Sequence, residues 1–124
     1  MNNSQITVIY KWTAKPGKLA ELTAIYEKVT AAMNANEPGA LSVHVHVSAK
    51  DNAIHVHDVF ADPQALGFHL SQTAAQHFPA LLEVAVPGAF IFLGDVPEEL
   101  QAGALNMGLA AEFSPHSHGF NRAA

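Results

Sequence analysis

Histidines are the residues of this sequence whose type and spacing could do chemistry most directly. The stretch "SVHVHVSAKDNAIHVHDVF", residues 42–60, holds four of the eight histidines of the 124-residue chain. They are His44, His46, His55 and His57, and alternation puts side chains two positions apart on one face of a strand. Imidazole binds zinc, nickel and copper, and it titrates near neutral pH. The stretch therefore allows three interpretations: a metal site, an acid–base site or a polar interface.

The pairing of two strands decides how these imidazoles are arranged. We predict strands over about 41–48 and 53–60, joined by a loop of residues 49–52. Antiparallel pairing then opposes His46 to His55 and His44 to His57, on the face opposite the apolar partners. Opposed Cβ atoms lie roughly 4.5–5.5 Å apart, so the imidazoles could share a metal. No carboxylate completes a ligand set, because Asp58 points to the other face. An imidazole layer in an interface is therefore favoured over a native metal site.

The flanking residues predict the elements that position these groups. Residues 6–14 alternate as a half-buried strand, and apolar residues recur at three- and four-residue steps in a helix from 18 to about 36. Asp62 and Pro63 begin a second helical segment that runs to about 84 and is broken near Thr73. "AFIFLGDV" then forms a fourth strand. This βαββαβ order predicts an α+β, ferredoxin-like sandwich, an antiparallel sheet with helices on one face.

The chain is expected to form one such domain, 1–96, followed by a C-terminal extension, 97–124. The extension starts with a short helical segment, "PEELQAGALNMGLA", and closes with the irregular "EFSPHSHGFNRAA". It is too apolar to be disordered. We expect it to pack on its own subunit or on a partner subunit.

Composition excludes several classes of function. The formal net charge of −5 and the lack of a Lys/Arg cluster disfavour nucleic acid as a partner. No apolar run approaches the roughly 20 residues that span a membrane, and no secretory signal is apparent. The absence of cysteine excludes disulfides, thiolate metal sites and a cysteine nucleophile. A cytoplasmic location is expected.

Three segments, in order, resemble the antibiotic biosynthesis monooxygenase family, including its quinol monooxygenase branch, over roughly residues 6–95. They are "ITVIYKWTAKPGK", "NEPGALSVHV" and "IHVHDVFADPQALGFHLSQ". In the last segment the matching positions are Asp58, Phe60, Asp62, Ala65, His69 and Ser71, with Asp58 standing where many members have Glu. The resemblance implies a homodimer whose two sheets face each other as a dimeric α/β barrel. It also implies oxidation of phenolic or quinol-like substrates by O₂ without metal, flavin or haem.

Cofactor-free oxygenation requires a base, because the deprotonated substrate is the species that reduces O₂. His69 is the candidate base, since its helix position faces the sheet and imidazole titrates near neutral pH. Asp58, surrounded by aromatic side chains, is predicted to orient His69 or to act as a base with a raised pKa. The substrate-binding residues are predicted to be Tyr10, Trp12, Phe60 and Phe92.

The sequence thus predicts a cofactor-independent monooxygenase that acts on a small aromatic or quinol-like substrate, with no cofactor. One alternative is a non-catalytic dimeric protein that binds a small molecule. The other is a metal- or haem-binding protein that uses the four clustered histidines, or His69 and His77. Haem degradation is less favoured. The haem-degrading enzymes resemble this chain in fold, but they carry Asn at the position of Tyr10 and Trp at that of His69.

Overall fold

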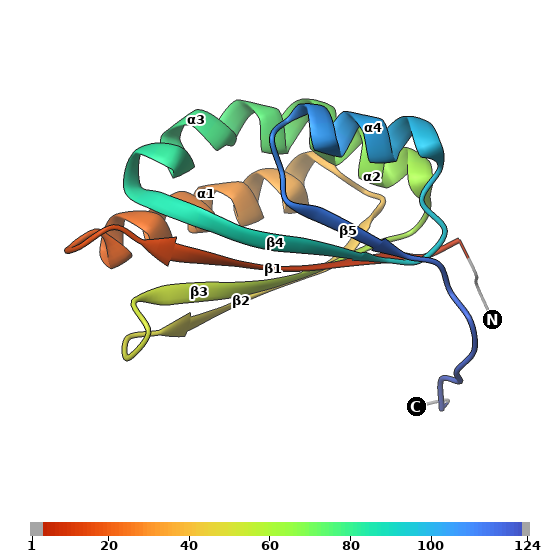
Figure 1. Ribbon diagram of the computed structural model, residues 1–124, viewed down its shortest axis with the longest axis horizontal. Helices are drawn as coiled ribbons and strands as arrows, with labels where there is room; N and C mark the ends of the chain where they lie inside the picture. The colour runs from red at the N-terminus through yellow and green to blue at the C-terminus, as the bar shows by residue number, and fades with distance from the viewer. Residues whose placement is uncertain (1–3, 123–124) are drawn as a thin grey trace.

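A five-stranded sheet forms one layer of the protein and the helices form the other, as the computed structural model of residues 4–122 shows (Figure 1). The strands lie in the order β2-β3-β1-β4-β5. Their bounds are β1 Ile6–Ala14, β2 Ala40–Ser48, β3 Ala53–Phe60, β4 Ala85–Leu93 and β5 Ala111–Ser114. The helices are α1 Leu19–Asn36, α2 Pro63–His69, α3 Ala75–Val84 and α4 Glu98–Asn106, with a π-helical turn over Leu70–Ala74. The predicted α+β, ferredoxin-like architecture is confirmed.

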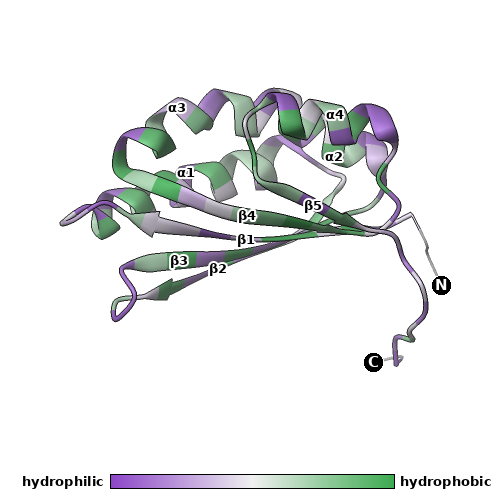
Figure 2. Cartoon of the chain, viewed as in Figure 1, coloured by the Kyte–Doolittle hydropathy of each residue, from purple (hydrophilic) through white to green (hydrophobic). Residues whose placement is uncertain are grey.

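Strand β1 is central because it pairs antiparallel with both β3 and β4. Its even-numbered side chains, from Ile6 to Trp12, are buried against the helices, whereas the odd-numbered ones lie on the other face. Figure 2 shows β1, β3 and β4 hydrophobic along much of their length and the β2–β3 loop hydrophilic. The core therefore lies between the sheet and the helical layer, and this is where a buried site would form.

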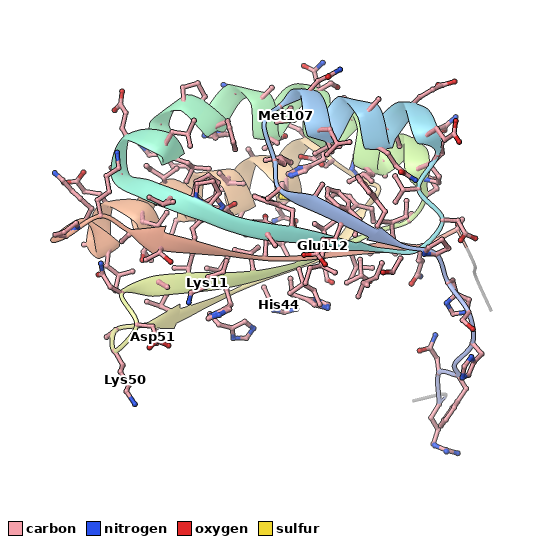
Figure 3. All side chains as sticks on the ribbon, in the orientation of Figure 1. Lys11, His44, Lys50, Asp51, Met107 and Glu112 are labelled. Atoms are coloured by element: carbon pink, nitrogen blue, oxygen red, sulfur yellow. The ribbon has the colours of Figure 1, made fainter. Side chains whose placement is uncertain are left out.

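The β2–β3 hairpin has the predicted register. His44 lies opposite His57 and His46 opposite His55, across a loop of residues 49–52. Asn52 takes the left-handed conformation (φ 53°) that closes the turn, and asparagine tolerates it better than most residues. Figure 3 shows His44 and Lys11 on the side of the sheet away from the helices. All four histidines thus share the open face.

The second helical segment has no loop in it, but it changes from α-helix to π-helix and back to α-helix. The Asp62 side chain accepts a 2.8 Å hydrogen bond from the Ala65 backbone N–H and caps α2, as predicted. The π-helical turn over Leu70–Ala74 separates α2 from α3, where a break near Thr73 was predicted. Such wide turns occur often at functional sites. Here the turn follows directly after His69.

Two boundaries differ from the prediction. Strand β4 begins at Ala85 rather than Ala89, so "VPG" belongs to the strand. The β1–β4 register shifts between Tyr10 and Trp12, next to the pairing of Trp12 with Pro87. At such an irregularity a proline is tolerated although it cannot donate a hydrogen bond to the neighbouring strand. The predicted end at Val96 was also wrong, because Gly94 turns the chain with φ 132°, a conformation that favours glycine.

The C-terminal segment contributes a strand that the sequence did not predict. After α4, β5 pairs parallel with β4, and the Phe113 ring stacks on Phe92 with 5.0 Å between centroids. Residues 115–122 have no regular structure and are exposed. They pass the sheet toward its open side (Figure 1). No helix within residues 4–122 is long and apolar enough to cross a membrane.

Candidate functional site

A small cavity of about 40 Å³ lies between the sheet and the helices. All six predicted site residues are on its wall: Tyr10, Trp12, Asp58, Phe60, His69 and Phe92. A cavity of this size holds about one water-sized molecule. The structure therefore brings the predicted residues together, around a space much smaller than a quinol.

A chain of hydrogen bonds runs along one side of the cavity. The indole N–H of Trp12 donates to the Tyr26 hydroxyl at 3.1 Å, and Tyr26 donates to the Tyr10 hydroxyl at 3.2 Å. Tyr10 in turn donates to Oδ2 of Asp58 at 2.8 Å. All four side chains are buried, so each hydroxyl and the indole satisfy one another inside the core. The chain ends at a carboxylate whose other oxygen, Oδ1, has no hydrogen-bond partner within residues 4–122.

Burial dominates the electrostatics of Asp58. Loss of solvent raises the pKa of Asp58 to about 6, although the charge of His69 and the hydrogen bond from Tyr10 lower it. Burial, followed by the nearby Asp58 charge, also raises the pKa of Tyr10 well above its usual value. Tyr10 therefore stays protonated and donates to Asp58, while Asp58 changes its charge close to neutral pH.

His69 is held by a second carboxylate that the sequence did not single out. Its Nδ1 lies 3.0 Å from Oε2 of Glu37, and both side chains are buried. Burial alone would raise the pKa of Glu37, but the hydrogen bonds from His69 and Thr73 and the His69 charge lower it. The carboxylate is thus ionised and favours the tautomer with the proton on Nδ1. Nε2 then remains as the acceptor.

The hydrogen-bond partner of His69 is Glu37 and not Asp58. Asp58 influences His69 through its charge, but its hydrogen bond is to Tyr10. The sequence showed Glu37 only as part of the "NEPG" turn that ends a helix, and Tyr26 only as one apolar position of that helix. The one signal in the sequence was an acidic residue directly before the Pro-Gly turn.

The close approach is visible at Gly39. A Cβ atom at that position would lie 2.5 Å from the Ala65 Cβ on α2, so only glycine allows the two segments to meet. The Gly39 carbonyl also accepts a 2.8 Å hydrogen bond from Ala61 N–H. The turn after α1 is thereby fixed against the start of α2, which carries His69. This contact puts Glu37 within reach of the imidazole.

Other residues complete the wall. His77 and Phe78 of α3 line it, as do Met107 and Leu109 from the segment that connects α4 to β5. Met107 lies in the helical layer in Figure 3. Arg122 lies over the exposed Phe120 ring, 5.0 Å from its centroid, and does not line the cavity.

Two further features lie outside the cavity. A groove of about 650 Å³ separates α1 from the edge strand β2, and Tyr26 lines both this groove and the cavity. On the open face of the sheet, His44, His46 and His55 are exposed and His57 is half-buried. Within residues 4–122 no three His, Asp or Glu side chains are grouped so that they could hold a metal ion.

Comparisons with known proteins agree with the two-layer fold. MupZ from Pseudomonas fluorescens is 21% identical and superposes with a TM-score of 0.78, covering 97% of this chain and 91% of its own. SnoaB, a cofactor-independent oxygenase from Streptomyces nogalater, is 22% identical with a TM-score of 0.63, over 76% of this chain and 95% of its own. Rv0793 from Mycobacterium tuberculosis is 18% identical with a TM-score of 0.66, over 77% and 98%.

A search of curated proteins found no match. The family model of antibiotic biosynthesis monooxygenases, by contrast, matches residues 5–81, which include β1, α1, the hairpin and the segment with His69. That match extends over more than half of the chain. The chain therefore belongs to the antibiotic biosynthesis monooxygenase family.

Proposed function

We propose that this protein is a cofactor-independent monooxygenase that oxidises a small aromatic or quinol-like substrate with O₂. The observation that carries the proposal is the buried hydrogen bond between Glu37 and His69, whose ring lies on the cavity wall. Glu37 holds Nδ1 of the imidazole and leaves Nε2 as the base for a phenolic O–H or an activated C–H. Family membership, and the fold shared with an oxygenase described as cofactor-independent, support the same reaction class.

The wall suits a flat, apolar substrate. The Tyr10 and Phe90 rings are stacked with 4.5 Å between centroids, and Phe78 meets Trp12 edge-on at 5.8 Å. Ligand pockets usually have volumes of about 300–1,000 Å³, so a quinol must displace part of this wall. Phe78 and Leu70 are only partly buried, and Leu70 begins the π-helical turn. In the proposed complex these two side chains turn outward to admit the substrate.

The reaction follows from the electron-rich anion that His69 forms. Once the substrate has lost a proton, it transfers an electron to O₂, and the substrate radical and superoxide combine to form a carbon–oxygen bond. The imidazolium returns its proton to the peroxide, and loss of water from the hydroperoxide leaves one oxygen atom on the oxidised carbon. The ionised Glu37 stabilises the imidazolium that results from the proton transfer. The apolar wall keeps water away from the anion.

Oxygen uptake tests this proposal. Protein treated with chelator is mixed with a panel of hydroquinones and anthrones in an oxygen electrode, and His69→Ala is compared with wild type. We expect turnover in wild type and a loss of about 100-fold or more in the variant. His118→Ala, a change in the exposed tail, serves as the matched control. No uptake by wild type contradicts the proposal. Equal uptake in His69→Ala removes His69 as the base and favours the binding-protein alternative.

We also propose that the chain forms a homodimer through the open face of its sheet. This face carries the four histidines together with half-buried β-branched side chains such as Ile9, Val59 and Ile91. Uncovered apolar groups on one face of a sheet favour a partner layer. The cytoplasm stays the proposed location.

A further inference from the structure

One oxygen of the buried Asp58 carboxyl group is unused by the protein. Tyr10 donates to Oδ2, whereas Oδ1 has no hydrogen-bond partner within residues 4–122. The side chain is 1% exposed and belongs to the cavity wall. A buried oxygen without a hydrogen-bond partner is unfavourable, and a ligand atom that hydrogen-bonds to it removes part of that penalty. Oδ1 is therefore a natural contact for a substrate oxygen.

The same wall carries a second group that exchanges protons. His69 uses Nδ1 for Glu37, which leaves Nε2 for the cavity, and its ring packs on Phe60 with 5.1 Å between centroids. Each of the two groups is fixed by its own neighbour, Tyr10 for Asp58 and Glu37 for His69. One small apolar space thus has an acid and a base anchored independently, an arrangement suited to concerted acid–base chemistry.

From this geometry we propose that the site also catalyses a reaction that needs no O₂, the keto–enol tautomerisation of cyclic aryl ketones with an activated C–H group. His69 moves the proton at carbon and Asp58 moves the proton at oxygen. The inference rests on the same cavity as the proposed monooxygenase but not on its oxygen chemistry. Aryl ketones fit because their flat rings match the aromatic wall and their carbonyl oxygen can meet Oδ1.

The step balances without an oxidant. Nε2 of His69 takes the proton from carbon, and the C–H electron pair becomes the new C=C bond. The π pair of the carbonyl group moves to oxygen, which receives the proton from Oδ1 of Asp58. The product is the enol, with His69 as imidazolium beside the Glu37 carboxylate and Asp58 ionised. Once the proton on His69 has exchanged with solvent, reversal of the transfers returns the ketone with a solvent hydrogen at carbon.

The protonation behaviour of Asp58 fits the role of a donor that is also readily re-protonated. Burial raises the pKa of Asp58 to about 6, so both forms are populated near neutral pH. Besides His69, four titratable groups lie near it: Tyr10 on β1, Tyr26 and Glu37 on and after α1, and His77 on α3. Burial raises the pKa values of both tyrosines, and the pKa of Glu37 is lowered. These three do not change charge in the range where Asp58 does.

Hydrogen–deuterium exchange under argon tests the inference directly. Wild-type protein is incubated with 2-tetralone or anthrone in D₂O, and loss of the activated methylene signal is followed by proton NMR. We expect exchange at least tenfold faster than in buffer with wild type and with His118→Ala. Asp58→Asn and His69→Gln should each lose at least tenfold of that acceleration. Asp58→Asn should also remove one limb of the pH–rate profile, which a purely structural effect would not do.

The outcomes separate this inference from the proposed oxygenation. Exchange under argon without oxygen uptake in air supports the tautomerase and contradicts the monooxygenase. Oxygen uptake in air without exchange under argon does the reverse. Thermal melts show whether each variant is folded. If Asp58→Asn is not folded, Asp58→Glu, which keeps a carboxyl donor, is tested in its place. Exchange no faster than in buffer for both ketones, or an unchanged pH profile in a folded Asp58 variant, overturns the inference.

Discussion

At the scale of single residues, two buried carboxylates that interact with His69 lie in different environments. Glu37 is ionised and hydrogen-bonds His69, whereas Asp58 is shifted toward its neutral form and hydrogen-bonds Tyr10. Environments that separate two acids in this way usually mark an acid and a base. Burial raises the pKa of both acids; in Asp58 this effect prevails, whereas in Glu37 the hydrogen bonds from His69 and Thr73 and the charge of His69 outweigh it.

Glu37→Gln tests the positioning role of Glu37. The amide still reaches His69 but does not carry the charge that stabilises the imidazolium. We expect oxygen uptake to fall about 10- to 100-fold in kcat with little change in KM, and the limb of the pH–rate profile that reports the base to move to lower pH. Steady-state kinetics from pH 5 to 9 measure both effects.

Glu83→Gln, an exposed position of α3, is the matched control. It should leave kcat and the pH profile unchanged. A Glu37→Gln protein with wild-type kcat and the same profile would show that Glu37 only stabilises the fold.

The raised pKa of Asp58 also predicts how stability depends on pH. The folded protein binds this proton more tightly than the unfolded chain between pH 3.8 and about 6. The free energy of unfolding therefore falls as pH rises through this window and does not recover above it. Roughly two pH units correspond to about 3 kcal/mol. Asp58→Asn lacks this titration, so wild type should lose about 2–3 kcal/mol relative to the variant between pH 4 and pH 7.5.

Urea denaturation of both proteins at the two pH values measures the difference. The contribution of Glu37 has the opposite sign, since its lowered pKa costs stability as pH falls, but it is common to both proteins and cancels. A difference that does not change with pH would mean that Asp58 is ionised in the folded state throughout.

At the scale of elements, the contact between Gly39 and Ala65 positions the Glu37–His69 pair. Gly39→Ala forces its methyl group against the Ala65 Cβ, so α2 must shift. We expect a loss of about 1–3 kcal/mol in unfolding free energy and a lower kcat, because Glu37 and His69 move apart. Removing the opposing methyl group in Gly39→Ala/Ala65→Gly should restore much of the activity, since the two segments can then approach again. Urea denaturation and oxygen uptake of both variants measure these effects. A Gly39→Ala protein with wild-type kcat would contradict the positioning role of the Gly39–Ala65 contact.

The elements that the sequence predicted are those with a regular local pattern. Alternation revealed the face of β1 and the register of the hairpin, and Asp62 with Pro63 marked the start of α2. β5 was missed because a strand of 4 residues is too short to show alternation. Its pairing with β4 depends on tertiary contact alone.

The candidate site was predicted in part for the same reason. Four of its residues lie on one face of the sheet, so their convergence follows from strand alternation: Tyr10 and Trp12 on β1, and Asp58 and Phe60 on β3. The partner of His69 could not be found in this way. Glu37 reaches it through a glycine contact between segments far apart in sequence, and no periodicity reports such a contact.

At the scale of the whole molecule, the two faces of the sheet have opposite character. One face packs the core and the cavity, and the other combines imidazoles with apolar side chains. Lys11 lies beside His55 on the open face, and Glu112 of β5 lies beside Ile91 (Figure 3). These two are the other charged groups that the paired strands bring next to the central rows of this face. The proposed dimer would therefore bury a layer with more basic side chains than acidic ones.

Protonation of that layer should weaken the dimer. Each proton that this layer gains adds a positive charge, and these charges repel one another and Lys11 across an interface between identical surfaces. The monomer then binds more protons than the dimer, so the dissociation constant rises as pH falls. We expect at least a tenfold rise between pH 7.5 and 5.5 by analytical ultracentrifugation. The variant with Asn at positions 44, 46, 55 and 57 keeps hydrogen-bonding side chains but not the titration, and its dissociation constant should not change. A wild-type dissociation constant that is constant across this range would exclude the histidines from the interface, and a monomer at pH 7.5 would contradict the dimer itself.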